Sequence, residues 1–203
     1  MEKRHNIDDF LGVFDGYLDH KVCDDLIQIF ESEHYQRQKY NRIKGEGTRP
    51  SFKKDEAIGL CRDTHTEASL KVSEKLHDAL RETLHIYMNE TSILDFVGIP
   101  REDLTFCGFK IQKTQPSGGY HVWHVEQGYK GNQNRVFVYT VYLNEINLGG
   151  ETEFLIQKRR ISAVKGRICF FPAHFPYVHR GNPPLKDNKY IATSWIINNQ
   201  PPS

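Results

Sequence analysis

The residues best suited to chemistry lie in the second half of the 203-residue chain. His124 and Glu126 are two positions apart, so on a β-strand an imidazole and a carboxylate leave the same face and are aimed at one point. His179 supplies a second imidazole later in the chain. Two imidazoles and one carboxylate suit a first-row transition metal, and these three residues are therefore the predicted metal ligands.

One other histidine, His174, competes for the second imidazole position. His174 lies close to His179, but only His179 is followed by an Arg-Gly pair and then, ten positions on, by a lysine. His174 is therefore assigned to the rim of the site. His121 lies three positions before His124 and faces the other side of a regular strand, so we expect it to pack or to support the ligands rather than bind metal.

Lys189 is the candidate anion-binding cation. It follows His179 across the turn-forming segment Gly181-Asn-Pro-Pro184, and a hairpin there puts both side chains on neighbouring strands that face one pocket. An interior lysine is costly unless it is paired, so an anionic ligand is expected. An iron triad beside a buried cation is what a 2-oxoglutarate-dependent dioxygenase requires, because the keto acid chelates the metal at one end and carries a carboxylate at the other.

At these residues the sequence resembles the prolyl 4-hydroxylase-like branch of the Fe(II)/2-oxoglutarate dioxygenases. The motifs, in order, are His124-Val-Glu126, Tyr142-Leu-Asn144, Gly149-Gly-Glu-Thr-Glu-Phe154, Gly166-Arg-Ile-Cys-Phe-Phe-Pro172, His179-Arg-Gly181 and the segment from Lys189 to Trp195. Together and in this order the motifs are highly specific for the family, whereas any one of them alone is weak evidence. The resemblance implies Fe(II), 2-oxoglutarate and dioxygen as metal and co-substrates, with ascorbate as the reductant that rescues the iron.

The resemblance also implies roles around the metal. Tyr142 is expected to join Lys189 at the distal carboxylate of 2-oxoglutarate, and Trp195 to line the inner pocket, although either aromatic side chain is equally at home packed in a barrel. Arg135 and Tyr120 are candidates for substrate contact.

Two positions depart from the pattern of the relatives. Thr114 stands where they often carry a tyrosine, so the expected hydrogen-bond donor to 2-oxoglutarate is its shorter hydroxyl, with Gln112 and Gln115 as alternatives. Glu126 stands where they more often carry aspartate. The longer carboxylate still reaches a metal, but it alters the position or tightness of binding.

Composition excludes several classes of protein. A net charge of +1 argues against a nucleic-acid-binding surface over the whole molecule. No apolar run approaches a membrane span, and the first residues lack the apolar core of a secretory signal, so no membrane partner is expected. The four cysteines form no CxxC motif and are predicted to be free thiols in a reducing cytoplasm. The sequence indicates no oligomeric state.

The first half of the chain is predicted to be mainly helical. A short strand and turn over residues 10–18 lead into a helix with Val22, Leu26 and Phe30 on one face. Thr64-His-Thr-Glu67 matches a capping box at the start of the longest helix. Residues 93–103 are interpreted as a connector. Residues 35–54 are polar and basic and predict a solvated loop, or alternatively a lid over the substrate that uses the cations Arg42, Lys44, Arg49, Lys53 and Lys54.

The second half of the chain reads as strands. They are expected at residues 104–112, 120–126, 135–143, 153–155, 167–171, 175–179 and 189–197. Helices followed by many short strands predict a mainly β (α+β) fold, namely a double-stranded β-helix or jelly-roll barrel with N-terminal helices packed on one face. One domain is expected over residues 1–203, with 1–103 as helical support and candidate substrate loop and 104–199 as the catalytic barrel.

The substrate does not follow from the fold. A proline in a protein or peptide is the first choice, because of the resemblance and the basic loop. The alternatives are a free amino acid, another small metabolite or a nucleobase. A non-catalytic barrel that binds a metal or a partner protein is the alternative of a different class.

Overall fold

The computed structural model describes residues 2–36, 38–45, 49–61, 63–128 and 131–200. Its larger sheet contains β1 (Arg4–Asp8), β2 (Leu11–Asp15), β3 (Tyr40–Asn41), β5 (Glu56–Leu60), β6 (Leu104–Phe106), β7 (Phe109–Thr114), β9 (Arg135–Tyr142), β12 (Ile168–Pro172) and β14 (Lys189–Asn198). Its smaller sheet contains β4 (Lys53–Lys54), β8 (Gly119–His124), β10 (Thr152–Phe154), β11 (Arg159–Ile161) and β13 (His179–Gly181).

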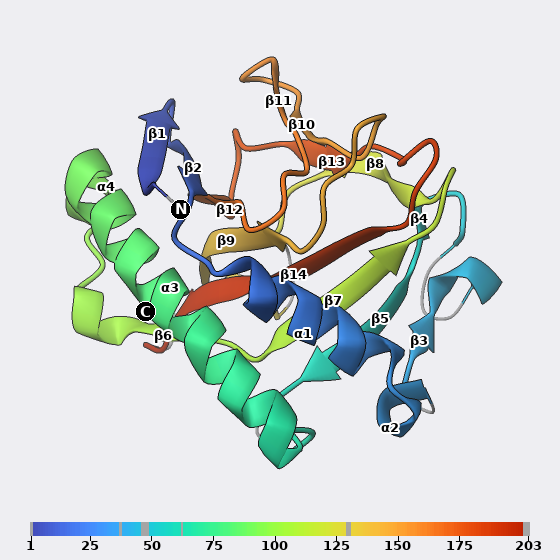
Figure 1. Ribbon diagram of the computed structural model, residues 1–203. Helices are drawn as coiled ribbons and strands as arrows, with labels where there is room; N and C mark the ends of the chain where they lie inside the picture. The colour runs from blue at the N-terminus through green and yellow to red at the C-terminus, as the bar shows by residue number, and fades with distance from the viewer. Residues whose placement is uncertain (1, 37, 46–48, 62, 129–130, 201–203) are drawn as a thin grey trace.

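Both sheets are antiparallel, and helices cover the outer side of the larger one (Figure 1). The helices are α1 (His20–Glu31), α2 (Glu33–Gln36), α3 (Glu67–Thr91) and α4 (Ile93–Val97), with short 3-10 turns at Arg42–Lys44 and Arg101–Asp103. The strand order is β1-β2-β12-β9-β14-β7-β5-β3 in the larger sheet and β11-β10-β13-β8-β4 in the smaller. The predicted mainly β fold with helices on one face is confirmed.

The central strand β9 is buried on both sides, which explains why its sequence is apolar almost throughout. Phe137, Tyr139 and Val141 pack toward the helices, in the same cluster as Leu26 of α1 and Leu80 of α3. Val138 and Tyr142 point the other way, into a second cluster between the sheets. The shared outer core supports the single-domain organisation, which stays a prediction.

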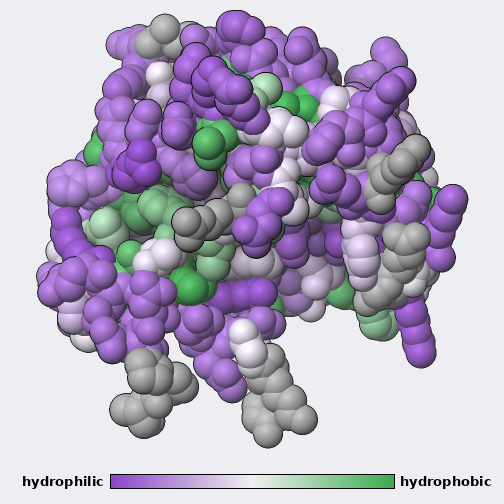
Figure 2. Space-filling view, turned by 90° about the horizontal axis from the view of Figure 1, so that it is seen from below, coloured by the Kyte–Doolittle hydropathy of each residue, from purple (hydrophilic) through white to green (hydrophobic). Residues whose placement is uncertain are grey.

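One face of the molecule is mostly polar (Figure 2). Seen from below in Figure 2, the surface is mostly hydrophilic, with small hydrophobic areas in between. None of the described helices combines the length and the apolar character that a membrane crossing requires.

Three of the predicted strands are wrong in extent, one of which, over residues 120–126, ends at His124. The strand expected over residues 104–112 is interrupted at Gly108, where an added Cβ would lie 2.8 Å from the carbonyl oxygen of Leu60. Residues 175–178 form no strand, because Pro176 has no N–H to donate to a ladder and the Tyr177 amide turns back to the His174 carbonyl at 3.0 Å.

The sequence also concealed several elements. β1, β3, β4, β5 and β11 were not expected, and each is short or lies in a polar segment. The predicted loop over residues 35–54 contains α2, β3, a 3-10 turn and β4, although residues 37 and 46–48 lie outside the described part. The expected connector over 93–103 contains α4 and another 3-10 turn.

The predicted capping box is off by two positions. The N-cap of α3 is Thr66, whose hydroxyl accepts from the Ser69 amide at 3.2 Å while the Ser69 hydroxyl accepts from the Thr66 amide at 2.8 Å. Thr64 instead closes the preceding turn by donating its hydroxyl to the Gly59 carbonyl at 3.0 Å.

We therefore expect Thr66→Ala to lower the free energy of unfolding by about 1 kcal/mol, because the first turn of α3 loses its cap. Thr66→Ser keeps the hydroxyl and is the matched control, expected to stay close to the wild type. Urea denaturation followed by circular dichroism measures both. Equal stability of the alanine and serine variants would contradict this N-cap assignment.

Candidate active site

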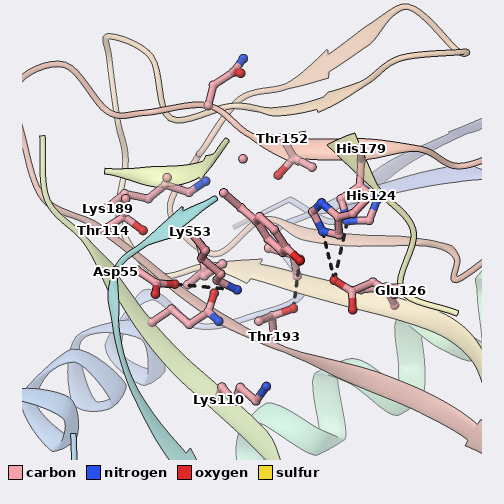
Figure 3. A pocket seen from close by; sticks show the side chains of 18 of the residues that line it. Lys53, Asp55, Lys110, Thr114, His124, Glu126, Thr152, His179, Lys189 and Thr193 are labelled. Atoms are coloured by element: carbon pink, nitrogen blue, oxygen red, sulfur yellow. Dashed lines mark hydrogen bonds and ion pairs between the residues drawn. The ribbon is translucent and has the colours of Figure 1, made fainter. Parts of the chain in front are cut away.

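The three predicted metal ligands meet at one end of a cavity between the sheets (Figure 3). His124 ends β8 and His179 begins β13, and the two residues stand opposite each other in the ladder. Glu126 Oε1 lies 3.3 Å from His124 Nε2 and 3.9 Å from His179 Nε2. Glu126 is not on the strand, as the sequence interpretation assumed, but just past its end, where the chain bends back toward the same point.

Both imidazoles are oriented for metal binding by backbone carbonyls. The Nδ1 of His124 contacts the Val122 oxygen at 3.0 Å, and the Nδ1 of His179 contacts the Tyr177 oxygen at 3.0 Å. With a proton on each Nδ1, each Nε2 presents its lone pair to the site. Burial lowers the pKa of His179 to about 4, which keeps this imidazole neutral.

The carboxylate of Glu126 is held ionised and oriented. Burial alone would raise its pKa, but the neighbouring His124, His179 and Lys53 outweigh burial and lower the pKa to about 2. Its Oε2 accepts from Trp195 Nε1 at 2.9 Å and from Arg135 Nη1 at 3.2 Å. Oε1 is left to face the histidines. Two imidazoles and one oriented carboxylate fit a divalent transition metal.

Trp195 and Arg135 both line the cavity, and both support Glu126. The Arg135 guanidinium lies 3.5 Å from the centroid of a Trp195 ring. Their predicted contacts, with 2-oxoglutarate for Trp195 and with substrate for Arg135, stay predictions. Tyr120, the other candidate for substrate contact, stacks on His124 with ring centroids 3.6 Å apart.

Lys189 reaches the same cavity from the opposite sheet. The predicted hairpin between His179 and Lys189 is wrong, because β13 belongs to the smaller sheet and β14 to the larger, and the proline-containing link crosses between them. Lys189 is 5% exposed, and burial lowers its pKa to about 8 against the opposing charge of Glu151. No carboxylate of the described residues lies within 4.0 Å of its ammonium, so an anion is needed there.

Hydroxyls surround Lys189. Thr114 is its direct partner in the β7–β14 ladder and also lines the cavity. The ring centroid of Tyr142 lies 5.4 Å from the ammonium, but the Tyr142 hydroxyl is bonded to Thr152 Oγ1 at 2.7 Å, and of these two side chains it is Thr152 that lines the cavity. A direct contact of Tyr142 with a bound anion stays a prediction. Gln112 lines the cavity as well.

The sequence interpretation missed Asp55, Lys110 and Thr152 as residues of this site. Lys110 was readable, because Lys110, Gln112 and Thr114 alternate along β7 and so share one face. Asp55 gave no signal, since it stands between two short strands that were not expected. Of the basic residues assigned to a lid, Arg42 is buried and Lys53 lines the cavity, whereas Lys44 and Arg49 are exposed.

His174 lies outside this group, as expected, with its Nδ1 2.6 Å from the Phe175 oxygen. Closure of the lid stays a prediction. All four cysteines are free.

Comparison with known families gives a match over residues 109–197, the segment that contains all three predicted metal ligands. The matching family model is described as the 2OG-Fe(II) oxygenase superfamily. No curated protein sequence matches the chain.

Solved structures share the fold at low sequence identity. A viral collagen prolyl hydroxylase from Paramecium Bursaria Chlorella virus-1, in complex with 2OG, is 22% identical with TM-score 0.66, covering 92% of this chain and 95% of its own. A prolyl-4-hydroxylase from Pseudomonas putida is 16% identical with TM-score 0.66, covering 94% and 93%. A prolyl hydroxylase from Trichoplax adhaerens, in complex with a hypoxia inducible factor peptide fragment, is 14% identical with TM-score 0.70, covering 93% and 83%.

The hydrogen bond from Trp195 to Glu126 is open to direct test. We expect Trp195→Phe to weaken Fe(II) binding by about 10- to 100-fold, because the carboxylate loses the donor that fixes its orientation. Anaerobic titration with Fe(II) measures the affinity. Trp123→Phe is the matched control, since Trp123 lies on the same strand as His124 but is 36% exposed. Equal Fe(II) affinity in the two variants would show that the indole does not support the ligand.

Proposed function

We propose that this chain, which belongs to the 2OG-Fe(II) oxygenase superfamily, is a hydroxylase whose first-choice substrate is a proline residue in a peptide. One observation carries the proposed chemistry: the His124, Glu126 and His179 group shares a cavity with the buried Lys189, whose ammonium has no carboxylate within 4.0 Å in the described part of the chain. The three structures of similar fold, each named as a prolyl hydroxylase, support the choice of proline.

Fe(II) and 2-oxoglutarate, when bound, supply the oxidising chemistry by which one oxygen atom of dioxygen enters the substrate while 2-oxoglutarate becomes succinate and carbon dioxide. His124, Glu126 and His179 would hold the metal. Lys189 would pair with the distal carboxylate, with the hydroxyls of Thr114 and Thr152 beside it.

The protein's own part is to bind, orient and exclude water. The two imidazoles are fixed by the carbonyls of Val122 and Tyr177, and Glu126 is fixed by Trp195 and Arg135. Phe154 and Phe171 pack against the His179 ring, with centroids 5.7 and 4.7 Å away, and close the apolar side of the site. A rigid and partly dry surround of this kind favours reaction at the bound substrate over side reactions.

Two further elements belong to the proposal. Ascorbate is the expected reductant that restores the iron. A cytoplasmic location is supported by the four free cysteines, because disulfides are rare in reducing compartments.

The central test is spectroscopic. Under anaerobic conditions, Fe(II) and 2-oxoglutarate added to the purified protein should give the weak visible charge-transfer band of a chelated keto acid, and dioxygen should then yield succinate. We expect the band to be lost in His179→Ala and in Glu126→Ala, and succinate formation to be abolished in His124→Ala. A metal-replete wild type without the band would instead favour a non-catalytic or differently metallated barrel.

The lowered pKa of Lys189 predicts that the binding of 2-oxoglutarate depends on pH. Because its pKa is lowered to about 8, the ammonium loses its proton as the pH rises through that value, and its attraction for a carboxylate is then lost. We expect the dissociation constant of 2-oxoglutarate to rise roughly tenfold per pH unit above about pH 8. Lys189→Arg stays charged over this range and should abolish the slope. The same slope in the arginine variant would mean that another group governs binding.

A further inference from the structure

A second group of cations lies along the cavity, apart from Lys189. Arg42 Nε bonds to Asp55 Oδ1, and Lys53 Nζ lies 3.9 Å from Asp55 Oδ2, so one buried carboxylate faces two cations. Lys110 has no carboxylate within 4.0 Å among the described residues, and its ammonium lies 4.7 Å from the centroid of a Trp195 ring. Figure 3 shows Lys53 beside Asp55, with Lys110 and Lys189 at different parts of the cavity.

The two cationic regions are separated along the strands. In the β7–β14 ladder Thr114 pairs with Lys189 and Lys110 pairs with Thr193. Four residues of extended chain span about 13 Å. Figure 3 shows the two lysine side chains at different parts of the cavity, so an anion paired with Lys189 leaves the second group of cations without an anion of its own.

One donor in this group is left without a partner. Arg42 is 8% exposed, and its Nη2 is buried and makes no hydrogen bond within the described part of the chain. Burial also lowers the pKa of Lys53 to about 8 and lowers the pKa of Lys110. Buried cations and buried unbonded donors are unfavourable unless an anion accepts from them, so the arrangement suits a ligand.

The space for such a ligand is an outer groove that adjoins the cavity. The cavity and the groove share Lys53, Lys110 and Tyr120, and Arg42 lines the groove. Gly59 contributes no bulk, since a Cβ added there would meet nothing within 4 Å. A molecule can therefore extend from the metal end, past Tyr120, into the groove.

The charges lining the cavity and the groove are unbalanced. The cations are Arg42, Lys53, Lys110, Arg135 and Lys189, whereas the carboxylates are Asp55 and Glu126. Bound Fe(II) and the dianion 2-oxoglutarate cancel each other, so the positive excess remains when both are present. A substrate with a negative group removes part of this excess.

We propose that the outer groove binds a carboxylate of the substrate, between Lys53 and Lys110 and within reach of Arg42. This inference rests on the proposed hydroxylase function and narrows it to acidic substrates. The carboxylate belongs to an acidic residue next to the hydroxylated position of a peptide or to a free amino acid. In each case the groove positions the molecule while the reacting carbon lies at the metal end.

The test compares probes that differ by one charge. Two blocked tetrapeptides, acetyl-Ala-Glu-Pro-Ala-amide and its Gln counterpart, are titrated by calorimetry into the anaerobic protein with Fe(II) and 2-oxoglutarate. We expect the acidic peptide to bind about tenfold more tightly. Free L-glutamate and L-proline form the small-molecule arm. If L-glutamate binds more tightly than L-proline and the peptides do not bind, the carboxylate source is a free acid.

Lys110→Met and Lys53→Met keep the apolar stems and remove one charge each, and we expect each to reduce the acidic preference to less than about twofold. Lys75→Met, at an exposed lysine of α3, is the matched control and should keep the full preference. Near-ultraviolet circular dichroism verifies the fold of each variant. The inference is overturned if no acidic probe is preferred by the wild type, or if both groove variants keep the preference.

Failure of the proposed function can be distinguished from failure of the carboxylate inference. It shows as a missing charge-transfer band with Fe(II) and 2-oxoglutarate, whereas the failure of the carboxylate inference shows as equal binding of charged and uncharged probes by a protein that has the band.

Discussion

The carboxylate of Glu126 is the interaction on which the rest of the site depends. One oxygen faces His124 and His179 of the smaller sheet, and the other accepts from Trp195 and Arg135 of the larger sheet. The same side chain therefore faces the predicted metal site and connects residues of the two sheets at that end of the cavity. A glutamate side chain is long enough to make both sets of contacts.

Burial and charge oppose each other throughout the cavity. Desolvation lowers the pKa of Lys53 and Lys189, whereas Glu126 stays ionised because cations and histidines surround it. The residues that line the cavity and the groove thus hold more positive than negative charge, and a bound anion would reduce this excess. Stability and ligand binding are linked for this reason, since whatever binds the folded state alone also stabilises it.

The sequence selected His124, Glu126 and His179 from their residue types and order, and the structure brings their candidate ligand atoms within 4.8 Å of one another. Their role as metal ligands stays a prediction. The sequence interpretation failed where long-range placement decides. The proline-rich link before Lys189 reads as a hairpin, but it crosses between sheets, which no local pattern reveals. Asp55 was invisible because the strands around it are too short to show an alternation. The helices could be predicted from their regularly spaced apolar residues, because one face of each long helix packs on the larger sheet.

The indole of Trp195 contacts both a predicted metal ligand and a cation of the outer groove. Its N–H donates to Glu126, while Lys110 and Arg135 lie against its rings. Any occupant of the groove that shifts this ring also shifts the carboxylate, and a metal that draws on the carboxylate shifts the ring. The two binding equilibria are then reciprocal, each altering the other by the same factor. Through this one aromatic side chain, substrate binding in the groove can change the affinity of the protein for its metal.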